Sequence, residues 1–520
     1  MTVSRKPRSL PDDQKLRLWG VGWALALTFA AAVLAAGGTL YGLVVLLDFQ
    51  KIDTTAKLDA KTLFDLVKLS FGVVAGAGAL VALVVAYRRQ RVDEAGAHRE
   101  ATRLHTERFS QAVDKLGSDS PAVRLGGVHA LAGLADDAPD DSLRQTCIDV
   151  LCAYLQLPFT PDPGTDPAHQ EEHHRYLAFR KVRHTILRLI GDHYRRPKGT
   201  HRSWQGCDLD LTDVTIDGGM NFRGAEFSEG TVSFIGTTFS DGNVYFHGAM
   251  FSGGNVSFGG ATFSDGNVSF DDATFSDGNV HFNGATFSDG NVSFDDVTFS
   301  GSNVSFDDAT FSGSDVFFDS ATFSGSNVHF NGATFSDGNV HFNGATFSDG
   351  TVSFGSATFS DGTVSFDDAT FCGSDVSFSS ATFSGGIVSF HGAEFSDGNV
   401  SFGSATFPGG VLSFDLATFC GSDVSFSSAT FSGGAVYFEG ATFSDGALAF
   451  EGATFSGGTM YFDGATFSDG ALAFRNATFS GGALSFLDAT GPAPQGLLAA
   501  VGTPPPARVA LPAAWLPSAP

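Results

Sequence analysis

Cysteine is scarce in this sequence and follows no pattern. The chain of 520 residues contains five cysteines, at irregular intervals from Cys147 to Cys420. Zinc-binding knuckles need short, regular cysteine spacings, and small secreted domains carry many cysteines that pair into disulfides. Neither class fits this chain. Its few cysteines are typical of a protein in a reducing compartment.

The large apolar residues are unevenly represented. Methionine and tryptophan occur only 4 times each, whereas phenylalanine occurs 53 times and glycine 64 times. A mixed globular core draws on many apolar residue types. This composition argues against one ordinary globular domain and is typical of a chain with internal repeats.

Positive charge is nearly absent from the second half of the chain. Between Cys207 and Asp488 the only fixed cations are Arg223 and Arg475, and the whole protein has a net charge of −26. Nucleic acids are bound mainly through phosphate contacts from lysine and arginine. We therefore expect no direct nucleic-acid binding.

Two long apolar runs lie near the N-terminus. Residues 18–47 are almost free of charge and exceed the roughly 20 residues that a helix needs to cross a bilayer. The second run, residues 67–87, ends at an arginine cluster that begins with Arg88. Small residues recur in both runs, which would let two helices approach closely. The sequence predicts a two-helix transmembrane hairpin, with the lipid bilayer as its partner.

The charges beside these runs predict an orientation. Lysines and arginines occur within residues 1–17 and again directly after residue 87, whereas residues 48–66 mix both signs. Positively charged flanks stay on the cytoplasmic side of a membrane. We expect a multi-pass protein of the plasma (inner) membrane. Residues 48–66 would be extracytoplasmic, and both termini would be cytoplasmic.

Residues 88–200 show helical periodicity. Ser120 followed by Pro121 has the pattern of an N-cap with proline at the first helical position. Apolar residues recur at helical intervals on both sides of this point and predict short antiparallel helices, similar to HEAT-like hairpins. We expect a small α-helical neck.

Four histidines occur near the end of this neck. His169 and His173 are four residues apart, as metal ligands on one helical face can be, and His174 and His184 follow them. No third ligand joins them at a convincing spacing. We interpret them as surface residues and assign no metal, cofactor or catalytic residue to the chain.

A twelve-residue repeat covers residues 207–490. One series of phenylalanines runs in steps of twelve from Phe222 to Phe486, and a second runs from Phe227 to Phe479. A small or branched apolar residue stands two positions before nearly every Phe, and a polar residue stands between in most triplets. Residues two apart share one face of an extended segment. Each ATF or VSF triplet therefore predicts a short strand with two side chains inward.

The connectors between the triplets contain residues that tolerate tight corners. The motif SDGN, Ser264 to Asn267, is an example. Triplets and connectors together resemble the pentapeptide-repeat family, which implies a right-handed quadrilateral β-helix. The segment ERFSQAVDKLGSDSPAVRLGGVHALAGLA, Glu107 to Ala135, resembles the segment after the membrane anchor of bacterial membrane-bound members of that family.

The repeat differs from that family in length. Every second unit has two extra residues, so that two units total twelve and a four-sided coil needs 24. A flat coil of twelve is the alternative, but two Phe, a Val and an Ala are too bulky for so thin a coil at interior packing density. The longer coil predicts eleven or so coils. It also places Cys372 and Cys420 two coils apart, at about 9 to 10 Å, too far for a disulfide.

Aspartates at the SDG corners would lie one coil apart. Asp265 and Asp289 form such a pair, as do Asp337 and Asp361. Like charges this close either repel weakly across water or attract a cation. Glycine replaces aspartate at many equivalent corners, so we favour repulsion over a structural calcium site.

The repeat predicts binding rather than catalysis. No Ser, His and Asp converge in it, and a column filled with Phe has no cavity for a substrate. We expect a membrane-anchored, non-enzymatic scaffold that presents an acidic rod in the cytoplasm to an unknown protein partner. Residues 491–520 are rich in proline and alanine, and we expect them to be disordered.

An alternative function follows from the resemblance. Some pentapeptide-repeat proteins resemble duplex DNA in shape and charge and occupy the DNA-binding surface of topoisomerases. The acidic repeat would have a comparable surface charge. The alternative is therefore inhibition or protection of a gyrase-type enzyme by mimicry of DNA.

Overall fold

The computed structural model describes residues 60–516 except 161, 265, 469, 470, 494 and 495, together with seven separate positions between 27 and 41. The predicted segment 1–17 and most of the first span 18–47 therefore lie outside the described residues, and of the predicted loop 48–66 only residues 60–66 are described, as the start of a helix. The chain divides into two compact units, residues 1–104 and 105–520.

Helix α2, Ala60–Leu116, contains the predicted second span, residues 67–87. Among the described residues, however, no helix has an apolar stretch long enough to cross a membrane. Glycine and alanine alternate in the middle of the predicted span, and charged residues begin at Arg88. The predicted two-helix transmembrane hairpin is thus wrong for the described part of the chain. The cellular location stays a prediction.

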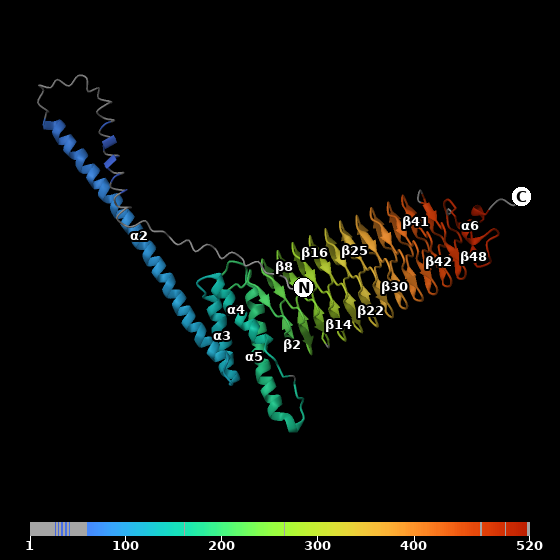
Figure 1. Cartoon of the computed structure of the whole chain (residues 1–520), viewed down its shortest axis with the longest axis horizontal. Helices are drawn as coiled ribbons and strands as arrows, with labels where there is room; N and C mark the ends of the chain where they lie inside the picture. The colour runs from blue at the N-terminus through green and yellow to red at the C-terminus, as the bar shows by residue number, and fades with distance from the viewer. Residues whose placement is uncertain are drawn as a thin grey trace, which may run out of the picture. The chain divides into compact units, whose positions relative to one another are not determined.

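Three further helices follow α2 within residues 88–200 (Figure 1). They are α3, Pro121–Asp136, α4, Asp141–Gln156, and α5, Gln170–Tyr194, which comes directly after the short 3-10 helix η2, Pro167–His169.

Helix α3 begins where the sequence predicts, with Ser120 at the N-cap and Pro121 in the first turn. The Ser120 side chain itself makes no capping hydrogen bond. Gly127 lets α3 approach the end of α2 closely, because a Cβ at this position would lie 2.6 Å from the backbone nitrogen of Leu116. Fully buried side chains such as Val128 and Ile148 fill the space between the helices.

Residues 209–485 form 47 short strands, from β1 (Leu209–Asp210) to β47 (Ala483–Ser485). They stack into four parallel sheets in which each strand pairs with the fourth strand before it and the fourth after it (Figure 1). A representative coil consists of β9 (Val256–Ser257), β10 (Thr262–Phe263), β11 (Val268–Ser269) and β12 (Thr274–Ser276).

The strand register confirms a coil of 24 residues. Thr262 pairs with Thr286 in the next coil, and a flat coil of twelve is excluded. The result is a right-handed β-solenoid of about 12 turns, close to the expected number. Cys372 pairs with Ser396, which in turn pairs with Cys420. The two cysteines therefore stand two coils apart, as the longer coil predicts.

Phenylalanine rings fill the interior of the solenoid. One layer contains Phe258, Phe263, Phe270 and Phe275, and none of these side chains is more than 1% exposed. Phe258 stacks on Phe282 of the next coil with ring centroids 4.8 Å apart, and it meets Phe270 edge to face at 5.6 Å. Burial of one Phe side chain contributes about 1.5–3 kcal/mol. The column of rings is therefore the main source of stability in this part of the chain.

The corners explain the recurring SDGN motif. Asp277 has a φ of 57°, a left-handed conformation that Asp and Asn tolerate better than most residues. Gly266 is needed for a different reason, because a Cβ there would lie 2.1 Å from the carbonyl oxygen of Gly242 in the preceding coil. Glycine at this position therefore lets successive coils stack at strand spacing, whereas other corners, such as Gly313–Ser314, accommodate a buried serine there.

The C-terminal tail corrects another prediction. Residues 491–520 were expected to be disordered, but their described part contains helix α6, Leu497–Val501, and strand β48, Val509–Ala510. Strand β48 pairs with β47, and Trp515, only 7% exposed, packs edge to face on Phe486. The last layer of rings needs a cover, and these segments supply it. Proline and alanine content alone does not reveal such a contact.

Candidate functional site

Each sheet of the solenoid presents one ladder of outward side chains. The sheet that contains β10 has threonine at this position in every strand, from β2 (Thr215–Asp217) to β46 (Thr478–Phe479). We call this sheet the threonine face. The sheet of β12 is also mostly threonine, and the sheet of β9 is mostly serine with His281 and His329. Small polar side chains thus predominate on three of the four faces.

The sheet that contains β11 differs, because large rings interrupt its serine ladder. The outward rings are Tyr245, Phe317, His341, Tyr437 and Tyr461. We call this sheet the aromatic face. It holds every tyrosine of residues 207–490 and the single phenylalanine of that range that belongs to neither inward series.

The outward rings of the aromatic face form stacked pairs. Phe317 and His341 have ring centroids 5.2 Å apart, and so do Tyr437 and Tyr461. All four side chains are partly exposed to solvent. Burial raises the pKa of Tyr437, and the nearby Tyr461 and Glu439 raise it further, so that its hydroxyl remains a hydrogen-bond donor at neutral pH. Tyrosine and phenylalanine are enriched in the cores of protein interfaces.

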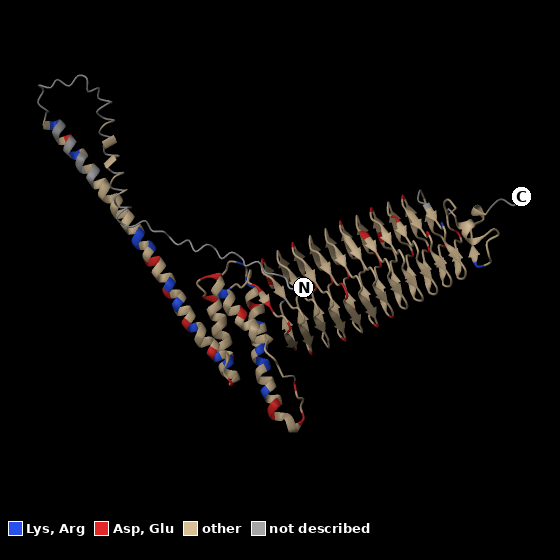
Figure 2. Cartoon of the chain, viewed as in Figure 1, with Lys and Arg blue, Asp and Glu red and all other residues tan. Residues whose placement is uncertain are grey.

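Carboxylates line the corner between the aromatic face and the sheet of β12. We call this row the acidic edge, and it comprises Asp271, Asp295, Asp319, Asp367, Asp415, Glu439 and Asp463. Figure 2 shows the contrast between the acidic solenoid and the many basic residues of the helices. The acidic edge runs beside the stacked rings for most of their length.

Backbone contacts hold the acidic edge in place. The Asp319 N–H donates to Asp295 Oδ1 at 3.1 Å, and the Glu439 N–H donates to Asp415 Oδ1 at 2.9 Å. Burial raises the pKa of Asp295, and the charges of Asp319 and Asp271 also raise it. A cationic group of a binding partner would reduce the repulsion among these like charges, which lie one coil apart.

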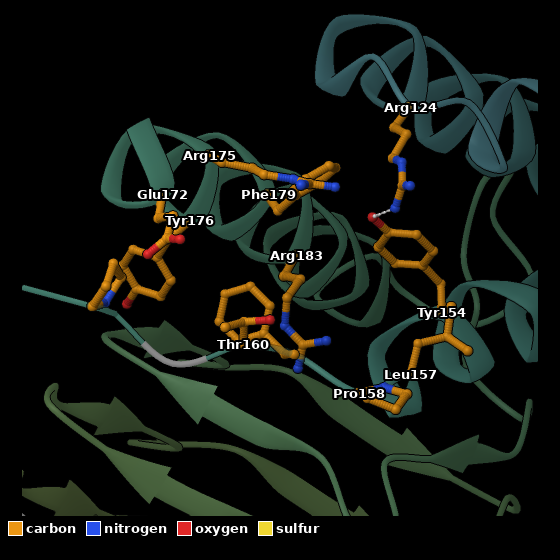
Figure 3. A pocket seen from close by; sticks show the side chains of 12 residues that line it. Arg124, Tyr154, Leu157, Pro158, Thr160, Glu172, Arg175, Tyr176, Phe179 and Arg183 are labelled. Carbon is orange, nitrogen blue, oxygen red and sulfur yellow. Dashed lines mark hydrogen bonds between the residues drawn. The ribbon is translucent and has the colours of Figure 1, made fainter. Parts of the chain in front are cut away.

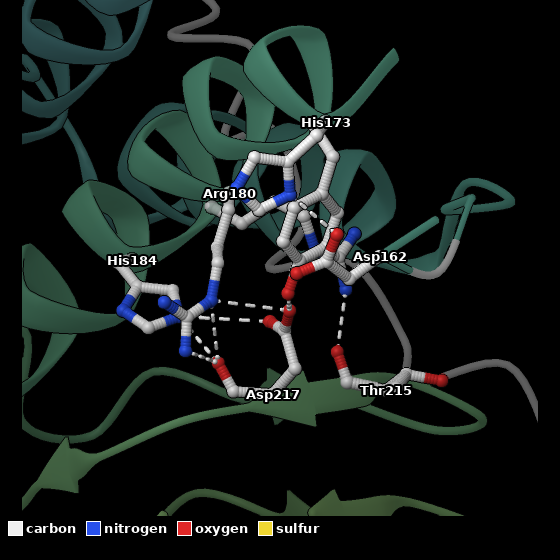
Figure 4. A network of polar contacts seen from close by, with 8 residues as sticks. Asp162, His173, Arg180, His184, Thr215 and Asp217 are labelled. Atoms are coloured by element: carbon white, nitrogen blue, oxygen red, sulfur yellow. Dashed lines mark hydrogen bonds and ion pairs between the residues drawn. The ribbon is translucent and has the colours of Figure 1, made fainter. Parts of the chain in front are cut away.

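The histidines of the neck do not converge. His173 Nδ1 lies 2.6 Å from Asp162 Oδ1, whereas His184 Nε2 lies 2.7 Å from the carbonyl oxygen of Asp217. Figure 4 shows these two contacts in one polar network. Within the part of the chain that the structure describes, no group of three or more His, Cys, Asp or Glu side chains could hold a metal ion.

The network in Figure 4 fastens α5 to the first coil. Asp217, 7% exposed, accepts hydrogen bonds from the Tyr176 hydroxyl and, at 3.2 Å, from Arg180 Nε. Burial alone would raise the pKa of Asp217, but the hydrogen bonds from His184 and Tyr176 and the charge of Arg180 outweigh it and lower the pKa. We assign this network a structural role.

The candidate calcium pairs receive little support. Asp265 lies outside the described residues, so the structure does not describe its pair with Asp289. Asp337 and Asp361 are joined through their backbones, with the Asp337 N–H donating to the Asp361 carbonyl oxygen at 2.9 Å. This contact is an ordinary rung between coils.

The aromatic face was missed at the level of sequence, although the signal is present there. The positions of its five rings differ from one another by multiples of 24. His281 and His329, which also stand at the polar position of a triplet, are out of step with these rings by half a coil and lie on the sheet of β9. Sorting outward residues by coil position would have separated the two groups.

Comparisons with known proteins agree with the geometry. Residues 211–262 match the family of pentapeptide repeats (9 copies). No curated protein matches the chain. The matched residues form the first coils of a solenoid that continues with the same register to β47. The family match and the four-sided β-solenoid together support a pentapeptide-repeat protein.

Proposed function

We propose that the solenoid is a protein-interaction module that binds a basic protein segment along the aromatic face and the acidic edge. The observation that carries this proposal is the confinement of all outward tyrosines, and of Phe317, to one of four sheets. Scattered surface rings need no explanation, but rings that gather on one face are typical of binding surfaces.

The charge of the partner follows from the acidic edge. A segment rich in lysine or arginine could lie between the carboxylates and the rings and meet both. The chain already contains one such contact, because Arg223 lies over the ring of Tyr245 with its guanidinium carbon 3.9 Å from the centroid. Cation–π contacts of this kind add to the attraction between opposite charges.

The spacing of the rings suggests the length of the bound segment. Four coils separate His341 from Tyr437, which corresponds to about 19 Å along the solenoid at the usual strand spacing. The coils are linked by hydrogen bonds on all four sides, so the two ring pairs keep this separation. A rigid surface loses little conformational entropy on binding, which favours affinity.

A triple substitution tests this proposal in the full-length protein. Phe317, Tyr437 and Tyr461 are each changed to serine, the residue that occupies the same position in neighbouring strands such as β15 (Val292–Ser293). Matched controls on the threonine face are Thr310→Ser, Thr430→Ser and Thr454→Ser. Proximity labelling in living cells is then compared among the three proteins.

We expect the wild type and the threonine-face control to label the same basic proteins, and the aromatic-face variant to lose them. The purified partner should bind more weakly as salt concentration rises. If all three proteins label the same set, the aromatic face is not the binding surface.

A second candidate function is mimicry of DNA, and charge density favours it. Residues 207–488 contain about three dozen carboxylates. They are spread over about 12 turns that are spaced about 4.8 Å apart, which gives one negative charge per about 1.6 Å along the solenoid axis. Duplex DNA carries one per about 1.7 Å. Gyrase supercoiling measured with the full-length protein tests this candidate. If gyrase supercoiling is unchanged at a large excess of the protein, mimicry of DNA is excluded as its function.

A further inference from the structure

A pocket of about 470 Å³ lies in the helical part of the second unit. Helices α3 and α5, the end of α4 and the loop after α4 line it (Figure 3). Its volume is in the range of small-molecule sites. Three arginines and several aromatic rings contribute to its walls.

The arginine at the floor of the pocket is buried, and the carboxylate of Asp217 acts on its charge from nearby. Arg183 is only 5% exposed, and its guanidinium donates to the carbonyl oxygens of Leu155 and Thr215, both at 2.7 Å. Within the described residues it forms no ion pair with a carboxylate. A buried charge is costly unless an opposite charge compensates it. Asp217 pairs directly with Arg180 instead, so a ligand could supply a closer negative charge to Arg183.

The guanidinium groups of the other two arginines both lie over one ring. The guanidinium carbon of Arg124 is 4.6 Å from the centroid of Phe179, and that of Arg175 is 5.7 Å from it. Arg124 also donates to the Tyr154 hydroxyl at 3.0 Å. Figure 3 shows Arg124 reaching in from α3, and Arg175 and Arg183 reaching in from α5. Among the described residues, Arg175 has no carboxylate partner.

The charges of the lining leave a positive excess. Against the three arginines stands one carboxylate, that of Glu172. The excess of two positive charges equals the charge of a phosphate monoester dianion. Arginine is also the residue best suited to phosphate, because its planar group can donate two parallel hydrogen bonds.

We infer that this pocket binds a small molecule that carries a phosphate group on a planar aromatic body. The phosphate would lie among Arg124, Arg175 and Arg183. The aromatic body would pack against the rings of Phe159 and Tyr176, which line the same cavity. This inference does not depend on the function proposed for the solenoid.

Calorimetric titration of the full-length protein tests the inference. The probes are adenosine monophosphate, which has both features, adenosine, which lacks the phosphate, and inorganic phosphate as a competitor. The diagnostic variant is Arg175→Gln, because the only contact of this exposed side chain among the described residues is with Phe179. The control is Arg188→Gln on the same helix, where Arg188 pairs with Asp192 at 3.1 Å, away from the lining.

We expect adenosine monophosphate to bind at least about tenfold more tightly than adenosine, and inorganic phosphate to displace it. Arg175→Gln should weaken binding of adenosine monophosphate by roughly tenfold and leave adenosine unaffected. Arg188→Gln should change neither. Equal binding of adenosine monophosphate and adenosine, no binding of adenosine monophosphate, or equal losses in both variants would overturn the inference.

Discussion

The helical part of the second unit and the solenoid build their cores in different ways. Between the helices, each buried side chain has its own neighbours, and Gly127 must be glycine because of one particular backbone nitrogen. In the solenoid, one layer of four rings repeats about 12 times, and each layer contacts only the next. A destabilising substitution should therefore affect all the packed helices, but in the solenoid only the neighbouring coils.

The two regions also differ in how they carry charge. The solenoid holds carboxylates on its corners, where water and backbone N–H groups surround them. The helical part holds arginines against rings and carbonyl groups, and one of them, Arg183, is buried. A basic partner is thus expected on the solenoid and an anionic one on the helical part of the same compact unit.

The largest effect is expected from a cavity in the middle of the solenoid. Phe306→Ala removes a fully buried ring that stacks on Phe282 and on Phe330. Such truncations cost about 3–5 kcal/mol. Hydrogen exchange should accelerate in the two or three coils around the site and remain slow in α3–α5. Uniform acceleration along the whole chain would contradict local coupling.

A smaller but more widespread effect is expected from Gly127→Val. The new Cβ would meet the Leu116 backbone at 2.6 Å and force α2 and α3 apart, with an expected loss of about 2 to 3 kcal/mol. Because these helices share one core, exchange should accelerate in α3, α4 and α5 together. Gly126→Ala is the control, since a Cβ there meets nothing within 4 Å. Equal melting temperatures for the two variants would refute the close contact.

Removal of the tail tests the cap on the last coil. A chain that ends at residue 502 lacks β48 and Trp515, which leaves the edge of β47 and the ring of Phe486 uncovered. Exposed strand edges pair with other chains. Light scattering should show self-association that grows with concentration. A chain ending at residue 516 retains the cap and should behave as the full-length protein does; identical scattering from both truncations would argue against a capping role.

The smallest effect is expected from acid titration of the polar network at α5. Folding lowers the pKa of Asp217, so its contribution to stability is present above the unfolded value of about 3.8 and disappears as pH falls through the lower folded value. The melting temperature of the wild type should therefore decrease as pH is lowered through this acidic range. Asp217→Asn should reduce the dependence on pH, whereas Asp119→Asn on the exposed loop before α3 should not. If the melting temperatures of both variants depend on pH to the same extent, Asp217 does not contribute to the acid sensitivity.

The solenoid could be predicted from sequence because its contacts are periodic. The position of Phe258 determines what stacks on it, since the next ring is always 24 residues away. The same interval of 24 residues applies to the aromatic face, where Phe317 pairs with His341 of the next coil. The transmembrane hairpin was predicted from the scarcity of charge in two runs, but no helix among the described residues has an apolar stretch long enough to cross a membrane.

The sequence alone determined the coil length, the inward direction of the two phenylalanine series and the acidic surface of the solenoid, because these depend on short distances along a repeating chain. Only the tertiary structure decided where Trp515 packs and that Arg124, Arg175 and Arg183 share one pocket. These side chains come from segments without a common period. Their contacts arise from the three-dimensional packing of helices and loops, which no spacing in the sequence encodes.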